Sequence, residues 1–180
     1  MKPVSVRKDY AVVKARRVIR EMDLTGPPVL AREVAEYLGI IFDYHMGVIN
    51  YPISFEVNGE YYISVNVSGN EGRDNWSGVH EIAHVDLGHF RIYEVDTLGK
   101  TVLTNRERQV LDREADIYAR ELLMPKDWIL QAVDMPLTAR QVGELKDLFM
   151  VSWKAIIIRL EELGIAKRDE IVQLFRKARV

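Results

Sequence analysis

The sequence contains no cysteine among its 180 residues. This absence excludes disulfide frameworks, thiol nucleophiles and cysteine-ligated zinc, and it fits a reducing compartment. Any metal ion would therefore have to be held by histidine, aspartate or glutamate side chains.

The chain also lacks a strong excess of charge of either sign. Its 25 lysines and arginines stand against 27 aspartates and glutamates, which gives a formal net charge of -2. Domains whose whole surface binds nucleic acid usually carry a strong basic excess. The composition therefore argues against direct nucleic-acid binding as the main function, although it leaves room for local basic patches.

A long apolar run is missing as well. No stretch of about eighteen apolar residues, the length that crosses a bilayer, occurs in the sequence, and the first twenty residues do not resemble a secretory signal. We therefore expect a cytoplasmic protein without a membrane-spanning segment. With 48% hydrophobic and 29% charged residues, the composition predicts one globular domain over residues 1–180.

The pattern of apolar residues predicts an α+β fold. Helical spacing predicts helices over residues 8–22, 30–38, 76–88 and 105–124, the last of which ends at Pro125, and an all-helical region from 126 to 180. Short β-rich runs near 40–42, 53–57 and 61–65, with an Asn58-Gly59 turn between the last two, predict a small antiparallel sheet. Residues 66–75 are predicted to form a loop, and residues 90–104 are ambiguous.

Residues 80–84 read His-Glu-x-x-His. On a helix this spacing places both imidazoles on one face, one turn apart, as a single tetrahedral zinc ion requires. Glu81 lies about 100° around the helix from His80, so it is poorly placed to bind the same ion but well placed to act on a water molecule there. The motif therefore predicts a hydrolytic site with one Zn²⁺ ion held by His80 and His84 and with Glu81 as the catalytic base.

Two helical histidines that merely flank a glutamate are the alternative explanation. Three of the four histidines fall within ten residues, however, and this clustering favours a metal site.

The third zinc ligand has to come from another part of the chain. In the helix predicted over 105–124, Glu114 falls on the apolar stripe that contains Leu111 and Tyr118. A buried carboxylate is unfavourable unless it is paired or bound to a metal. The sequence therefore predicts Glu114 as the third ligand, and a salt bridge between Glu114 and an arginine or lysine is the competing explanation.

Several other residues are weaker candidates. Glu121 lies on nearly the same face as Glu114 and is the reserve ligand, whereas Asp112 and Asp116 are predicted to point elsewhere. His89 misses the metzincin spacing by one residue, so it is either a partner of a ligand or a surface residue.

Substrate-binding groups are less well defined by the sequence. Tyr62 and Tyr118 are candidates for stabilising an oxyanion, without a preference between them. The strand over 61–67 is predicted to be a sheet edge that binds the substrate as an added strand.

Three segments resemble the ImmA/IrrE family of metallo-endopeptidases. They are the motif over 80–84, Glu-Ala-Asp-Ile-Tyr-Ala over 114–119 and Leu-Leu-Met-Pro over 122–125. The likeness spans most of the chain, but the lead-in over 76–79 departs from the usual family pattern, and Tyr118 stands where the family more often has phenylalanine.

The resemblance implies a zincin-like fold and a zinc ion held by His80, His84 and Glu114. It also implies that the substrate is a helix-turn-helix transcriptional repressor, as expected for an anti-repressor from a phage, a mobile element or a stress regulon.

Two rival functions remain. Residues 137–163, within the helical subregion over 126–180, resemble a helix-turn-helix, and Lys154 and Arg159 could contact DNA. The second helix of this segment is largely apolar, however, and Glu161 and Glu162 would repel phosphate, so we favour a packing or repressor-docking role. A zincin fold that binds its partner without cutting it is the other rival, and the intact Glu81 argues against it.

Overall fold

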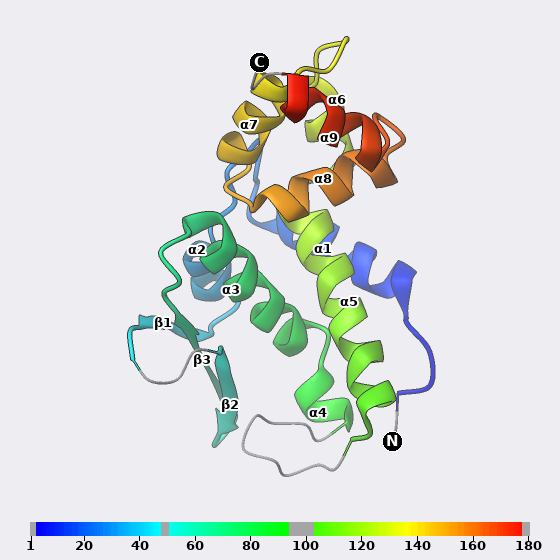
Figure 1. Ribbon diagram of the computed structural model, residues 1–180. Coiled ribbons are helices and arrows are strands. Elements are labelled where there is room, and N and C mark those ends of the chain that lie inside the picture. Colours follow the sequence, from blue (N-terminus) through cyan, green and yellow to red (C-terminus); the bar gives the residue numbers. More distant parts are fainter. Residues whose placement is uncertain (1–2, 48–50, 94–102, 178–180) are drawn as a thin grey trace.

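The computed structural model describes residues 3–47, 51–93 and 103–177 of the chain (Figure 1). The fold is α+β, as predicted. The helices described are α1 (Lys8–Glu21), α2 (Ala31–Tyr37), α3 (Glu71–Asp86), α4 (His89–Tyr93), α5 (Asn105–Leu123), α6 (Lys126–Ala132), α7 (Ala139–Leu148), α8 (Trp153–Glu162) and α9 (Arg168–Lys177). The strands are β1 (Ile41–His45), β2 (Ile53–Val57) and β3 (Glu60–Asn66).

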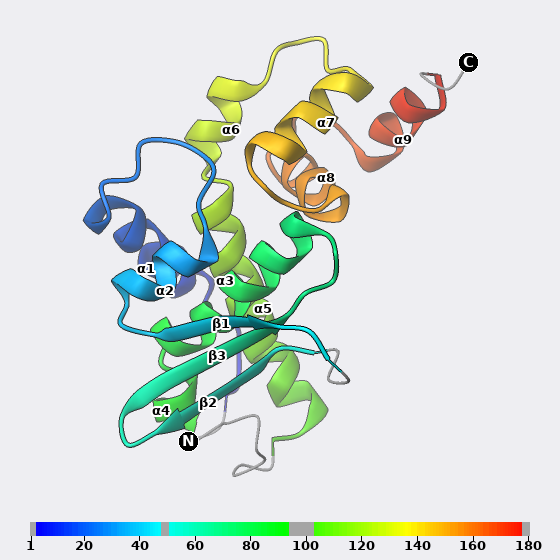
Figure 2. The ribbon, with the colours of Figure 1, turned by 90° about the vertical axis from the view of Figure 1, so that its left-hand side faces the viewer.

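The sheet has the order β1-β3-β2 (Figure 2). The predicted antiparallel pairing holds for β2 and β3, which Asn58 and Gly59 connect with positive φ values of 53° and 85°. β1 pairs with β3 in the parallel direction, so the sheet is mixed. The prediction that residues 61–67 form a sheet edge is wrong, because β3 lies in the middle and has a partner strand on each side.

The helix that carries the His-Glu-x-x-His motif begins five residues earlier than predicted. The Asn70 side chain caps it by accepting a hydrogen bond from the backbone N–H of Arg73. Its first turns are polar but partly buried: Asp74 accepts hydrogen bonds from the backbone and hydroxyl of Ser68, and Asn75 accepts one from the backbone N–H of Ala31. The first turns of α3 are therefore held by hydrogen bonds, and their sequence lacks the apolar periodicity that a buried helix usually shows.

α3 lies very close to the elements beneath it. A Cβ atom added at Gly78 would come within 2.6 Å of the Ala31 Cβ on α2 and within 2.9 Å of the Phe42 ring on β1. Glycine at this position therefore lets α3 sit close to α2 and to the sheet.

α5 runs beside α3 and packs mainly against α1 and α3. Its start is fixed by a capping box in which the Thr104 hydroxyl accepts from the backbone N–H of Glu107 and the Glu107 carboxylate accepts from Thr104. One face of α5 therefore packs against α1 and another packs against α3.

The C-terminal third is helical, as predicted, and lies at one end of the molecule (Figures 1 and 2). Thr138 caps α7 and Ser152 caps α8, both through side-chain oxygens. The largest cluster of buried apolar side chains extends from Ala11 on α1 to Ile171 on α9. None of the helices in the described parts of the chain is long and apolar enough to span a membrane.

Candidate metal centre

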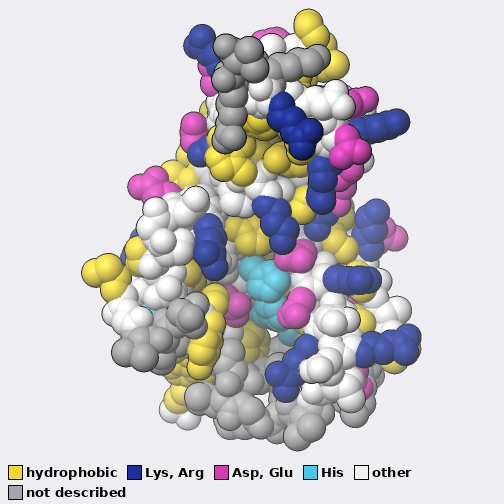
Figure 3. All heavy atoms as spheres, viewed as in Figure 1, with side chains coloured by type: hydrophobic (Ala, Val, Ile, Leu, Met, Phe, Trp, Pro, Cys, Tyr) yellow, Lys and Arg dark blue, Asp and Glu magenta, His cyan; other side chains and the backbone are white. Residues whose placement is uncertain are grey.

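α3 presents His80 and His84 on one face, one turn apart. Their Nε2 atoms lie 3.2 Å from each other. Space-filling representation shows the histidines at the bottom of a hollow, with acidic side chains beside them (Figure 3). The structure therefore brings together the two predicted histidine ligands.

Glu81 lies beside this pair and contacts the sheet. The hydroxyl of Ser54 on β2 donates a 2.7 Å hydrogen bond to Glu81 Oε2. Burial raises the pKa of the Glu81 carboxyl, and the neighbouring His80 and the Ser54 hydroxyl only partly oppose this rise. A carboxylate with a raised pKa accepts a proton more readily, which suits the predicted role as a base.

Two aspartates of α5 face the histidines, contrary to the prediction that they point elsewhere. Asp116 Oδ1 lies 3.1 Å from His80 Nδ1, and Asp112 Oδ1 lies 3.8 Å from His84 Nε2. The two aspartates are four residues apart and therefore share one face of α5. The sequence contains this i, i+4 spacing, but the apolar stripe used to orient the helix faces α1 and the core rather than the site.

His80, His84 and Asp112 form a possible ligand set. One ligand atom from each lies within 4.8 Å of the other two. Two histidine nitrogens and a carboxylate oxygen are the donors that zinc prefers when cysteine is absent. Burial raises the pKa of Asp112, and the neighbouring Asp116 adds to this effect while His80 opposes it, so positive charge at this position would be favourable.

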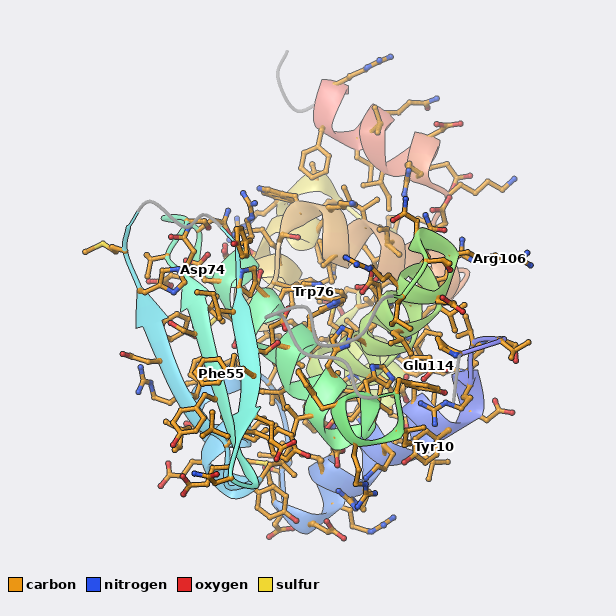
Figure 4. All side chains as sticks on the ribbon, turned by 90° about the horizontal axis from the view of Figure 1, so that it is seen from below. Tyr10, Phe55, Asp74, Trp76, Arg106 and Glu114 are labelled. Atoms are coloured by element: carbon orange, nitrogen blue, oxygen red, sulfur yellow. The ribbon has the colours of Figure 1, made fainter. Side chains whose placement is uncertain are left out.

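Glu114 is fully buried, as predicted, but its carboxylate faces other partners. The Arg7 guanidinium donates to it at 2.6 Å, the Arg7 backbone N–H donates at 2.7 Å, and the His89 Nε2 atom lies 3.0 Å away. Figure 4 labels Glu114 on the side of α5 that faces the N-terminal segment with Tyr10. The salt bridge that competed with metal ligation in the sequence analysis is thus present, and Glu114 is not among the three grouped ligand atoms.

The pKa of Glu114 reflects these partners. Burial alone would raise it, but the hydrogen bonds from His89 and Arg7 outweigh burial and lower the pKa to about 2. The carboxylate is therefore charged at neutral pH and accepts a hydrogen bond from the N–H group of His89 Nε2.

This chain of hydrogen bonds orients the histidines predicted as ligands. Because His89 Nε2–H donates a hydrogen bond to Glu114, the His89 Nδ1 atom can accept one from His84 Nδ1–H, which lies 3.0 Å away. His84 then presents an Nε2 lone pair, and His80, whose Nδ1–H faces Asp116, presents another. Two such lone pairs 3.2 Å apart repel each other unless a proton or a metal cation lies between them, so the residues present fit a metal ion.

The pKa values of the two histidines shift in opposite directions. Burial lowers the pKa of His80, but the bond to Asp116 and the nearby carboxylates outweigh burial and raise it. Burial, with the adjacent His80 and His89, holds the pKa of His84 well below its usual value. His84 is therefore neutral, which is the form that binds a metal ion.

The remaining candidates lie apart from the grouped ligands. Glu121 is paired with Arg16 and Arg159. The Tyr118 hydroxyl donates to Asp86, and the Tyr62 hydroxyl donates to Glu60. These contacts do not direct either tyrosine hydroxyl toward the histidine pair. The sequence analysis left the role of His89 open, and the structure places it in contact with His84, a predicted ligand.

A helix with two histidines one turn apart, a glutamate between them and a carboxylate from a second helix is typical of zinc-dependent peptidases. Fold and site therefore define a protein of the metallopeptidase type. Residues 28–161 match the Peptidase_M78 family, described as the IrrE N-terminal-like domain, and the chain belongs to this family. The match confirms the resemblance to the ImmA/IrrE family that the sequence motifs indicated. Among curated proteins, none matches the chain.

Proposed function

We propose that this protein is a zinc-dependent endopeptidase in which His80, His84 and Asp112 hold the ion and Glu81 is the general base. The observation that carries the proposal is the pair of facing histidine Nε2 atoms with the Asp112 carboxylate beside them. Asp112 takes the place that the sequence analysis gave to Glu114, because the Glu114 carboxylate is occupied by Arg7 and His89.

Each residue around the metal has a separate task. When bound, zinc would supply a Lewis acid that makes water nucleophilic near neutral pH. Glu81 would take the proton from the attacking water and pass it to the leaving amine, and its raised pKa favours holding that proton between the two steps. The Ser54 hydroxyl holds one oxygen of Glu81, which leaves the other oxygen for this proton transfer.

The substrate would bind along β2. Among the described strands, β2 pairs with β3 alone, and its Ser54 reaches the catalytic base. An extended peptide could therefore add to the outer side of β2 as a further strand and pass the metal ligands. This places substrate binding at β2 rather than at β3, where the sequence analysis expected it.

We propose a helix-turn-helix repressor as the protein substrate and the cytoplasm as the location. The first rests on the resemblance to ImmA/IrrE enzymes, and the second on the absence of cysteine and the composition of the sequence. The core cluster that extends from α1 to α9 supports the proposal that residues 1–180 form one domain, with residues 126–180 as a helical subregion.

The decisive experiment compares the wild-type protein with a Glu81→Gln variant on the repressor encoded beside its gene. The variant keeps all three proposed ligands, so we expect it to retain zinc while its rate of cleavage falls by about 10²–10⁴-fold. A chelator should abolish cleavage by the wild type, and added zinc should restore it. Binding of the repressor without any cleavage by the zinc-loaded wild type would instead support the non-proteolytic function.

A further inference from the structure

A cavity of about 320 Å³ lies directly beside the metal centre, where α3, α5 and α8 meet. It is lined by Arg73, Trp76, Ser77, Asp116, Arg120, Ser152, Lys154, Ala155 and Ile158. Asp116 connects the cavity with the candidate metal centre, because it lines the cavity and also contacts His80. A group bound in the cavity would therefore lie next to the reacting part of a peptide held at the metal.

Cations outnumber anions in the lining of the cavity, although the whole chain has a net charge of -2. Arg73, Arg120 and Lys154 contribute side chains, and Figure 3 shows basic side chains at the rim of the hollow that contains the histidines. Arg120 is paired with Glu162. Neither Arg73 nor Lys154 forms an ion pair within the described ranges of the chain, so both are available to a ligand.

The one negative charge among the described lining residues already has a partner. Of the described residues that line the cavity, only Asp116 is acidic, and its carboxylate contacts His80. An incoming carboxylate could thus pair with Arg73 and Lys154, which have no ion-pair partner among the described residues. Trp76 of α3, labelled in Figure 4, and Ile158 of α8 also line the cavity and offer apolar surface to the methylene groups of a side chain.

We propose that this cavity is a substrate subsite for a carboxylate, and that its preferred occupant is a glutamate side chain of the peptide. The proposal rests on the endopeptidase function proposed above and adds its specificity. Glutamate fits because its two methylene groups can contact Trp76 and Ile158 while its carboxylate reaches Arg73 and Lys154. The carboxylate at the C-terminus of a peptide has the same chemistry and is the other possible source.

A nucleic-acid phosphate is less suitable as the occupant. The three cations line a cavity of only about 320 Å³, whereas a duplex requires a broad basic surface. Glu161 and Glu162 on α8 also place negative charge on the same helix as Lys154.

The first test measures binding without cleavage. Zinc-loaded Glu81→Gln protein is titrated with the α-amide of N-acetylglutamate, the α-amide of N-acetylglutamine, and N-acetylglutamine with a free carboxylate, while NMR follows the indole N–H of Trp76. We expect saturable shifts with the glutamate compound at about tenfold lower concentration than with the glutamine amide, because tenfold corresponds to one modest charge-assisted contact. Equal binding of the two amides would overturn the proposal, whereas preference for the free carboxylate of N-acetylglutamine would identify a peptide C-terminus as the occupant.

Substitutions test whether the cavity is responsible for the preference for glutamate. Arg73→Gln combined with Lys154→Gln should abolish the preference for glutamate, and unfolding curves should confirm that the variant folds. Arg140→Gln removes the same kind of charge from an exposed position of α7 outside the cavity and should leave the preference unchanged. A preference that survives the double substitution would overturn the proposal, as would tight binding of a random DNA duplex that the double substitution abolishes.

Cleavage of an amidated peptide library by the zinc-loaded wild type then separates the subsite from the activity. We expect cut peptides to be enriched in glutamate at one fixed position, and this enrichment should disappear in the double variant. Selective binding of the glutamate compound without cleavage of any peptide would retain the subsite and reject the endopeptidase function. Cleavage without preference for glutamate would retain the activity and reject the subsite.

Discussion

At the scale of single residues, the candidate metal centre is connected to the N-terminal segment by a chain of contacts that runs from Arg7 through Glu114 and His89 to His84. Each contact is between 2.6 and 3.0 Å long. The chain fixes which nitrogen of His84 carries a proton and therefore which nitrogen is free for a metal ion. In the proposed assignment Glu114 thus supports His84 through His89, whereas the sequence analysis predicted Glu114 as a ligand.

The ligand assignment predicts different behaviour for Asp112→Ala and Glu114→Gln. Asp112→Ala removes a proposed ligand, so zinc affinity should fall sharply and the visible spectrum of Co²⁺ bound in place of zinc should change. Glu114→Gln should lower zinc affinity by about 10–100-fold, because it weakens the orientation of His84 through His89, and should leave the type of spectrum unchanged. Competition with a coloured chelator measures the affinities.

Glu121→Ala is the control for this comparison, since Glu121 is paired with Arg16 and Arg159, and its metal content should equal that of the wild type. If Asp112→Ala retains full zinc affinity while Glu114→Gln loses the metal, Glu114 is the ligand, as first predicted from the sequence.

The low pKa of Glu114 predicts a pH-dependent stability in the metal-free protein. In the folded state the pKa is about 2, below the usual 4.5, so the ionised group stabilises the fold above about pH 5. This contribution, of order 2–3 kcal/mol, should disappear as the pH falls from about 5 toward 2. Denaturant unfolding at several pH values should show the loss in the wild type and a flatter profile in Glu114→Gln. Parallel profiles for the two proteins would contradict the assignment.

The sequence predicted the arrangement of those residues whose geometry is set by local spacing. The histidine pair follows from a four-residue spacing on one helix, and Glu81 follows from its position between the histidines. Asp112 was wrongly predicted to point away from the histidines, because its orientation depends on how α5 packs between α1 and α3. That relation joins residues far apart in the chain and leaves no local pattern.

At the scale of elements, α3 is the helix on which the site is built, and polar contacts hold its first turns. The Asn75 amide bonds the backbone of Ala31 and Val29 at the start of α2 and the backbone carbonyl of Met150 before α8. One buried side chain therefore ties the N-terminal and C-terminal parts of the chain to the site helix. Removing it would leave several backbone groups without partners.

The close approach at Gly78 predicts that Gly78→Ala destabilises the protein. Alanine favours a helix by up to about 1 kcal/mol, but its methyl group would overlap Ala31 and Phe42, and such overpacking costs about 1–3 kcal/mol. The free energy of unfolding in denaturant should therefore fall. In Gly143→Ala on α7 the nearest neighbour is the half-exposed Trp153 ring at 3.2 Å, which can move, so this control should be at least as stable as the wild type.

Helix ends were better predicted than sheet order for a physical reason. The caps at Thr138 and Ser152 involve atoms three residues apart, so the local sequence determines them. The parallel pairing of β1 with β3 joins residues 21 positions apart, such as Ile41 and Tyr62, and depends on the packing of α2 and α3 against the strands. The start of α3 was missed because Asp74 and Asn75 are buried through hydrogen bonds rather than through apolar contacts.

At the scale of the whole molecule, the N-terminal segment completes the site. The family match begins at residue 28, so α1 and Arg7 lie outside it. Nevertheless α1 packs along α5 (Figure 1). Both Arg7 and Arg16 form ion pairs with carboxylates of α5. Residues before the matched segment thus contact the surroundings of the candidate metal centre.

This arrangement predicts that Arg7→Met lowers both stability and zinc affinity. The substitution removes the guanidinium from fully buried Glu114. Breaking a buried pair costs about 3–5 kcal/mol, and because the Arg7 side chain is 31% exposed we expect about 2–3 kcal/mol in unfolding experiments. The Glu114 carboxylate would then rely on His89 and on the backbone N–H of residue 7, so zinc affinity should fall by about tenfold.

Arg16→Met is the matched control, because it also removes an arginine of the N-terminal segment from a buried glutamate of α5. Glu121 keeps Arg159 at 2.9 Å, and the Arg16 side chain is 60% exposed, so the loss of stability should stay below about 1 kcal/mol and zinc affinity should not change. Equal losses of zinc affinity in the two variants would mean that α1 supports the site only by general packing. A loss confined to Arg7→Met would connect the metal centre to Arg7 through Glu114 and His89.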